Sequence, residues 1–151
     1  MKQAGRIHWL VIVACAALVA ILALAFLAGP SAGSTAGDFL RALQAGNVDR
    51  LTELSNVPKG EEAKLRKQWE FCIHAATPYY NFLWRSSFTK KITDEAEVVH
   101  IKLFKNADKP GSYDEDFEIP MVKVDGRWKV DIYRLTSKLY PALPRASSDL
   151  G

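Results

Sequence analysis

The chain has 151 residues, of which 48% are hydrophobic and 25% are charged, as expected for one globular domain with accessory segments. Its 20 lysine and arginine residues nearly balance its 17 aspartate and glutamate residues, and no run of like charges occurs. This excludes the basic footprint of a nucleic-acid-binding protein. Two cysteines as far apart as Cys15 and Cys72 exclude a disulfide scaffold.

The first element along the chain is a long apolar run. Residues 7–27 carry no charge, and Lys2 and Arg6 precede them. A helix over this run would be roughly 31 Å long at about 1.5 Å per residue, which matches a bilayer core of about 30 Å. Because positive charge stays on the cytoplasmic side, residues 1–6 are predicted inside and the rest of the chain outside. The sequence thus predicts a single-pass anchor in the cytoplasmic (inner) membrane.

Two other interpretations of this run remain open. A cleaved secretory signal has an apolar region of about 7–15 residues, which is shorter than this one. The stretch Ile12-Val13-Ala14-Cys15 resembles a bacterial lipobox, but apolar sequence continues beyond Cys15, whereas a lipidated cysteine normally heads a polar linker. We favour the uncleaved anchor, and leave cleavage and lipidation at Cys15 open.

A short linker and two helices follow the apolar run. Residues 28–35 are small and polar and are predicted as the linker. Apolar residues then recur at helical spacing from residue 36, and Gly46-Asn47 ends this helix because both residues tolerate a left-handed backbone. Asn47 can also cap a second, short helix. The apolar stripes of the two helices are Ala36, Phe39, Leu40 and Leu43, and then Val48, Leu51 and Leu54.

A third helix is predicted from about residue 61 to residue 76. Glu61 and Glu62 favour its first turn, where negative charge complements the helix dipole. Cys72 is interpreted as a small buried hydrophobe on this helix. The buried stripe of the helix is Leu65, Trp69, Cys72 and Ala76.

After the third helix the apolar period changes to two, which predicts strands. No further helix is evident before the tail at residues 141–151, which is expected to fray. The four predicted strands are Tyr79–Thr89, Glu97–Phe104, Tyr113–Val124 and Arg127–Leu135, with a hairpin loop at 106–112 between the second and third.

The last two strands form the clearest hairpin in the sequence. Asp125-Gly126 joins them as a two-residue turn, which needs positive φ at both residues. Strict alternation then places Trp128 in the core of the sheet and Lys129 and Asp131 on its opposite face.

Helices followed by an antiparallel sheet make an α+β arrangement, here a transmembrane helix and then about three helices packed on a curved sheet of about four strands. The stretches FLRALQAGNVDRLTEL and VDGRWKVDIYR resemble the nuclear transport factor two-like, or cystatin-like, superfamily. The resemblance covers about residues 36 to 136, within a predicted domain at residues 36–140. It implies a cone, in which the sheet wraps around the helices. Gly46-Asn47 stands where Gly-Asp is commoner in the superfamily, a change that keeps the capping role.

The resemblance also implies what an enzyme on this fold would need. Ketosteroid isomerases and scytalone dehydratases of the superfamily place carboxylates, tyrosine or histidine inside the cone, as a base and as a donor to the developing oxyanion. Here the inward faces of the strands are uninterrupted apolar sets, and His100 faces outward with Lys102. We therefore predict a non-catalytic protein without a cofactor. The apolar sets are Val99, Ile101 and Leu103, and Trp128, Val130 and Ile132.

Metal binding is not predicted. The acidic stretch Asp114–Glu118 does not match a calcium loop, because no glycine occupies the turn. No zinc spacing, phosphate loop or nucleophile elbow occurs either. The acidic stretch is interpreted as a solvated strand whose charge discourages edge-to-edge pairing.

Aromatic residues crowd the junction of the third helix and the first strand, and we interpret them as core. The alternative is that some line an open mouth. Tyr79 and Tyr80 would then offer a polar handle to an apolar ligand and Arg85 would meet an anionic group. His74, beside the buried stripe, is the fourth candidate, but no nearby carboxylate orients it as a base. The aromatic set is Trp69, Phe71, Tyr79, Tyr80, Phe82, Trp84 and Phe88.

The sequence therefore predicts a membrane-anchored, extracytoplasmic binding or accessory domain. Its expected partner is an apolar small ligand or another envelope protein, and its contact with the membrane is through residues 7–27. In bacteria, domains of the superfamily that it resembles often follow a single membrane anchor. Oligomerisation is left open, and a small isomerase or dehydratase acting on an apolar molecule is the alternative.

Overall fold

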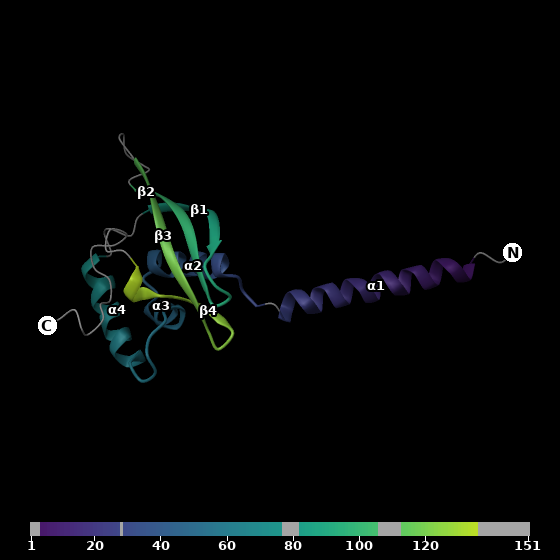
Figure 1. Cartoon of the computed structure of the whole chain (residues 1–151), viewed down its shortest axis with the longest axis horizontal. Helices are drawn as coiled ribbons and strands as arrows, with labels where there is room; N and C mark the ends of the chain where they lie inside the picture. The colour runs from purple at the N-terminus through teal and green to yellow at the C-terminus, as the bar shows by residue number, and fades with distance from the viewer. Residues whose placement is uncertain (1–3, 28, 77–81, 106–112, 136–151) are drawn as a thin grey trace. The chain divides into compact units, whose positions relative to one another are not determined.

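The computed structural model describes residues 4–27, 29–76, 82–105 and 113–135 (Figure 1). The chain divides into two compact units, Met1–Pro30 and Ser31–Gly151. Tyr79, Tyr80, the predicted loop at 106–112 and the predicted tail at 141–151 lie outside the described residues.

The first unit contains helix α1, Ala4–Leu27. A helix therefore forms over the apolar run, and its described side chains, residues 9–23, are all exposed, with Trp9 at 69%. Among the described residues, no helix combines the length and the hydropathy that crossing a membrane requires. The predicted membrane anchor at residues 7–27 is thus not supported by the structure.

Helix α2, Ala32–Gln44, begins earlier than the sequence predicts. The Ser31 hydroxyl oxygen caps it by accepting a hydrogen bond from the Ser34 amide at 3.2 Å. Ala32 and Thr35 are buried in the first turn. Residues 32–35, predicted as linker, therefore belong to the helix. The small side chains that suggested a flexible linker instead let the helix approach the sheet closely.

The end of α2 and the start of helix α3, Val48–Leu54, follow the prediction. Gly46 has φ +62°, and the amides of Gly46 and Asn47 donate to the carbonyls of Leu43 and Ala42 at 3.2 and 2.9 Å. This pair of bonds is a Schellman motif. The side-chain oxygen of Asn47 then accepts from the Arg50 amide at 3.0 Å, which caps α3. Gly46-Asn47 thus ends one helix and starts the next, as predicted.

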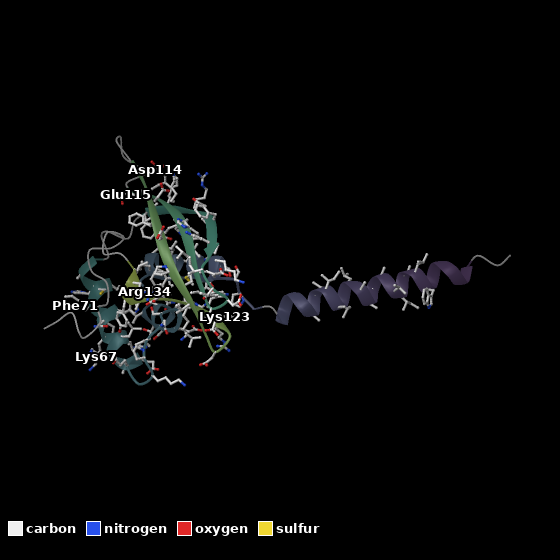
Figure 2. All side chains as sticks on the ribbon, viewed as in Figure 1. Lys67, Phe71, Asp114, Glu115, Lys123 and Arg134 are labelled. Carbon is white, nitrogen blue, oxygen red and sulfur yellow. The ribbon has the colours of Figure 1, made fainter. Side chains whose placement is uncertain are left out.

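Helix α4 runs over Glu62–Ala76. Leu65, Trp69 and Cys72 are buried along one side of it, as the helical stripe predicted. Phe71, two residues from Trp69, is 68% exposed and points away from the domain in Figure 2. The interpretation of Trp69 as a core residue is therefore confirmed, and that of Phe71 is wrong.

A four-stranded antiparallel sheet follows, in the order β1-β2-β3-β4. The α+β class and the four strands are confirmed. The fourth strand ends sooner than the predicted Leu135, because residues 132–134 form a 3-10 helix. The strands are β1 Phe82–Lys91, β2 Ala96–Lys105, β3 Tyr113–Val124 and β4 Arg127–Val130.

The hairpin of β3 and β4 has the predicted turn, since Asp125 and Gly126 have φ +49° and +78°. Trp128 is half-buried, not fully buried as predicted. It pairs with Lys123 next to the turn, where the Lys123 ammonium lies 5.7 Å from the ring centroid. Lys129 is half-buried as well, so the two faces of β4 differ less than strict alternation implies.

Helix α2 covers the inner face of the sheet and contacts all four strands (Figure 1). Inward residues of β2 and β3 meet the buried stripe of α2, and α3 and α4 add side chains to the same core. The largest fully buried side chains are Trp69, Phe39, Leu40, Leu43, Leu51, Leu65, Ile101, Leu103, Ile119, Met121 and Ile132.

Two glycines of α2 test how closely this helix packs on β1. A β-carbon at Gly37 would lie 2.9 Å from Cη2 of Trp84, whereas one at Gly33 would lie 3.6 Å from the Thr89 hydroxyl oxygen. Gly33→Ala is expected to raise the free energy of unfolding by roughly 0.5 kcal/mol, because alanine favours the helix. Gly37→Ala is expected to lower it by about 1–3 kcal/mol, because the indole must move.

Urea unfolding of the full chain, followed by circular dichroism, measures both glycine variants on the same scale. If Gly37→Ala were as stabilising as Gly33→Ala, the Trp84 ring would not lie against α2.

Candidate functional site

The interior of the second unit is filled with apolar side chains. Among the described residues, Thr35 and Ser55 are the polar side chains that are buried. Ser55 is satisfied there, because its hydroxyl donates to the Leu51 carbonyl at 2.7 Å and accepts from the Trp69 indole N–H at 3.3 Å. Neither residue is an acid or a base at neutral pH, so the buried positions described hold no general acid–base pair.

Cys72 is the buried titratable group of the described interior. Burial raises the pKa of its thiol to about 11. The thiolate is the nucleophilic form of cysteine, so a raised pKa makes Cys72 unreactive at neutral pH. The prediction of a small buried hydrophobe on a helix is confirmed.

The four predicted ligand-binding residues do not form one described site. Tyr79 and Tyr80 lie outside the described residues. His74 is exposed on α4, and Arg85 is exposed on β1. Arg85 faces away from the core, because its register partner Lys102 alternates with the buried Ile101 and Leu103. His74 and Arg85 thus belong to different elements, a helix and a strand, and each is exposed on its own element.

The outer face of the sheet carries an aromatic residue that the sequence placed in the core. Alternation along β1 would put Phe88 on the same face as Phe82 and Trp84. The register shifts between Ser86 and Phe88, so Phe88 pairs with His100 on the outer face instead. The two rings stack with centroids 4.0 Å apart and an interplanar angle of 19°. The prediction that Phe88 fills the core is therefore wrong.

Charged residues surround this stacked pair on the outer face. His100 Nδ1 lies 3.6 Å from Glu118 Oε1, and Lys102 Nζ lies 2.9 Å from Asp114 Oδ2 and 3.9 Å from Asp116 Oδ1. The hydrogen bond from Lys102 lowers the pKa of the Asp114 carboxyl, and the same bond raises the pKa of Lys102. The acidic residues Asp114, Asp116 and Glu118 of β3 are thus solvated, as the sequence predicted, and their pairs with Lys102 and His100 are a feature that the sequence analysis did not predict.

We call the patch formed by the outward side chains of β1, β2 and β3 the outer sheet face. Leu83 and Phe88 are the most exposed apolar residues on it, at 64% and 58%. Basic Arg85 lies on its β1 side, and acidic Asp116 and Glu118 lie on its β3 side. The half-buried apolar residues of this face are Val98, Phe104, Pro120 and Val122.

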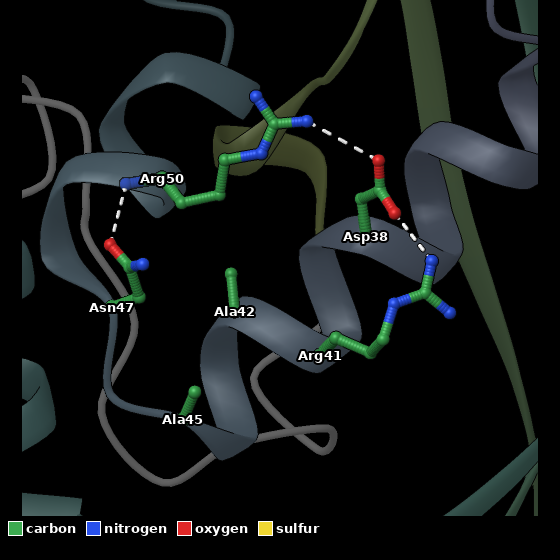
Figure 3. Close-up of a pocket in the computed structure, with 6 residues that line it drawn as sticks. All are labelled: Asp38, Arg41, Ala42, Ala45, Asn47 and Arg50. Carbon is green, nitrogen blue, oxygen red and sulfur yellow. Dashed lines mark hydrogen bonds and ion pairs between the residues drawn. The ribbon is translucent and has the colours of Figure 1, made fainter.

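A second feature is a surface hollow of about 320 Å³ between α2 and α3 (Figure 3). Sequence reasoning did not single it out, although the spacing of Asp38, Arg41 and Ala45 at i, i+3 and i+7 places them on one side of α2. We call it the arginine hollow, and it is lined by Asp38, Arg41, Ala42, Ala45, Asn47 and Arg50.

The second unit is an α+β domain in which helices pack on one face of a four-stranded antiparallel sheet. No family model matches the chain, and no curated protein matches it. Solved structures similar to it include an NTF-2 like protein of unknown function from Shewanella oneidensis MR-1, at 10% identity and a TM-score of 0.46. That likeness covers 64% of this chain and 88% of the other.

A ketosteroid isomerase-like protein from Erwinia carotovora atroseptica SCRI1043 is also similar, at 9% identity and a TM-score of 0.45 over 64% of this chain and 85% of the other. Because both TM-scores are below 0.5, these two likenesses do not establish the family of this chain. Its membership of the superfamily therefore stays a prediction.

Proposed function

We propose that this protein is a tethered, non-catalytic binding domain that holds a protein partner on its outer sheet face. The main support is the contrast between the two faces of the sheet. Helices α2, α3 and α4 cover the inner face, whereas on the outer sheet face Leu83 and Phe88 are more than half exposed beside paired charges. Large apolar side chains that stay exposed among charged groups are typical of protein interaction sites.

The shape and the charges of this face favour a protein as the occupant. Sites for small molecules are concave, whereas a sheet face is broad and shallow. Basic Arg85 lies on the β1 side, and acidic Asp116 and Glu118 lie on the β3 side. The matching partner surface has apolar residues opposite Leu83 and Phe88, an acidic residue opposite Arg85 and basic residues opposite the acidic side chains of β3. The Phe88 ring, which is stacked on His100, is suited to be its anchor.

We also propose that α1 tethers the domain to the cytoplasmic membrane, with the domain outside and an envelope protein as its partner. The support is the uncharged run at residues 7–27 behind Lys2 and Arg6, the helix over this run, and the exposure of its described side chains. Apolar helix surface of this extent is stable only when something apolar covers it.

The isomerase or dehydratase alternative and the apolar small ligand gain no support from the described residues. An enzyme would need a base and a donor converging in a cavity. The described interior offers Thr35 and Ser55 as its buried polar groups.

One experiment tests both the partner and the placement. Lys90→Cys, which lies on the outer sheet face beside Phe88 and leaves that ring in place, is made in the full chain with Cys15→Ser and Cys72→Ala, and intact cells are treated with a membrane-impermeant maleimide photo-crosslinker. We expect labelling without lysis and, after illumination, a discrete adduct from position 90. Lys67→Cys on the exposed side of α4 is the matched control, which should be labelled equally but give no such adduct.

Reversing the acidic charges of β3 tests whether the adduct depends on the charges of the outer sheet face. Asp116→Lys with Glu118→Lys should reduce the position-90 adduct at least about 10-fold, because like charges then face the partner. Labelling only after lysis would contradict the placement outside. Equal adducts from positions 90 and 67 would contradict a specific face. An adduct of twice the chain mass would contradict the envelope partner and identify a second copy of this chain as the occupant.

A further inference from the structure

The arginine hollow is independent of the outer sheet face and has a different chemistry. Two guanidinium groups reach it from two helices, Arg41 from α2 and Arg50 from α3, and both contact the carboxylate of Asp38 (Figure 3). The Arg50 Nη2 atom lies 3.3 Å from Asp38 Oδ2, and Arg41 contacts Oδ1 of the same carboxylate. A single carboxylate thus already occupies the position between two arginines.

The donors of the hollow outnumber its acceptors. Each guanidinium has five N–H donors, and the described bonds use one group of Arg41 and two of Arg50, whose other partner is Glu53 at 2.6 Å. The side-chain oxygen of Asn47 accepts the hydrogen bond that caps α3, and Figure 3 shows the side-chain amide nitrogen on the side of Ala42 and Ala45. The lining therefore presents three donor groups and one carboxylate.

The floor of the hollow leaves room for a small molecule. Ala42 and Ala45 end at their β-carbons, and the hollow between them and the arginines measures about 320 Å³. Planar guanidinium groups match the geometry of carboxylate and phosphate, to which they bind with two parallel hydrogen bonds. The Asp38 pairs are partly exposed, with side-chain exposures of 36–62%, so they hold the arginines weakly enough for a ligand to share them.

We propose that the arginine hollow binds a small soluble oxyanion, a carboxylate or a phosphate group, between Arg41 and Arg50. Asp38 competes with this group for the two arginines. The competing carboxylate keeps the affinity low, with a dissociation constant on the order of 1 mM. A ligand that also carries an ammonium or hydroxyl group gains a bond to Asp38.

The test uses the full chain in detergent micelles, with inorganic phosphate and acetate as probes and chloride at matched ionic strength as the reference. Nitrogen-15 NMR follows the arginine side chains. We expect saturable shifts of Arg41 and Arg50 with phosphate or acetate and none with chloride. Asp38→Asn should tighten binding about 10-fold, because it removes the competing charge.

Three variants separate the hollow from general surface charge. Arg50→Gln should weaken binding at least about 10-fold, and Ala45→Leu should do the same by filling the floor without changing charge. Arg66→Gln on α4, which also removes a paired arginine, should leave the affinity unchanged. The proposal is overturned if neither probe gives saturable shifts, if Arg66→Gln weakens binding as much as Arg50→Gln, or if Ala45→Leu has no effect.

Discussion

Replacing Trp69 by alanine is expected to lower the free energy of unfolding by about 3–5 kcal/mol, the range seen for large aromatic residues removed from cores. Trp69 is fully buried, it meets Phe39 edge to face with centroids 5.9 Å apart, and its indole N–H donates to Ser55. The substitution therefore removes ring contacts, a hydrogen bond and packing between α2 and α4 at once. Urea unfolding of the full chain, followed by circular dichroism, measures the loss.

Phe71→Ala is the matched control for Trp69→Ala. It removes an aromatic ring from the same helix, two residues away, but the Phe71 side chain is 68% exposed. We expect a change of less than about 0.5 kcal/mol. Equal losses for the two variants would mean that the buried side of α4 is assigned wrongly.

Cys72 should be about 100-fold less reactive toward iodoacetamide in the folded chain than in the unfolded chain at mildly alkaline pH. Burial raises the pKa of the thiol to about 11 from 9.0, and only the thiolate reacts. Limited access to the buried sulfur slows the reaction further. Alkylation of Cys15→Ser, followed by mass spectrometry with and without guanidinium chloride, measures the ratio.

The same pKa shift sets a dependence of stability on pH. Because the folded pKa is raised above the unfolded pKa, the burial of the neutral thiol contributes fully below about pH 9 and is lost as the pH rises through about 11. Cys72→Ala should remove this alkaline loss. Ala75→Cys in that background gives an exposed thiol on the same helix, and it should react at the unfolded rate. If Cys72 reacted as fast as the thiol introduced by Ala75→Cys, its burial would be contradicted.

Much of the fold could be predicted because its signals are local. Gly46-Asn47 predicts a helix end and a helix start from backbone preference alone, and both are found. Asp125-Gly126 likewise predicts the hairpin turn. The stripe containing Leu65, Trp69 and Cys72 predicts the buried side of α4 from helical periodicity.

The errors arise where tertiary contacts override local pattern. Residues 32–35 look like a linker, yet small side chains are also what a helix needs to lie close to a sheet. Trp128 follows the alternation of its strand, yet it is only half-buried. It lies close to the hairpin turn, where one side of its ring faces the Lys123 ammonium and solvent instead of the core. The arginine hollow depends on two helices meeting, so spacing on α2 alone indicates a polar side and not a site.

The register shift in β1 means that the number of residues in this strand decides which side chains lie on the outer sheet face. Between Ser86 and Phe88 the strand has one more residue than its partner strand uses, and every residue from Phe88 to Lys91 is turned over as a consequence. A point substitution at Phe88 would alter what the face displays, whereas loss of one residue here would exchange the two faces of the strand end. The exposed ring could thus be gained or lost in evolution by a single-codon insertion or deletion, with its chemistry unchanged.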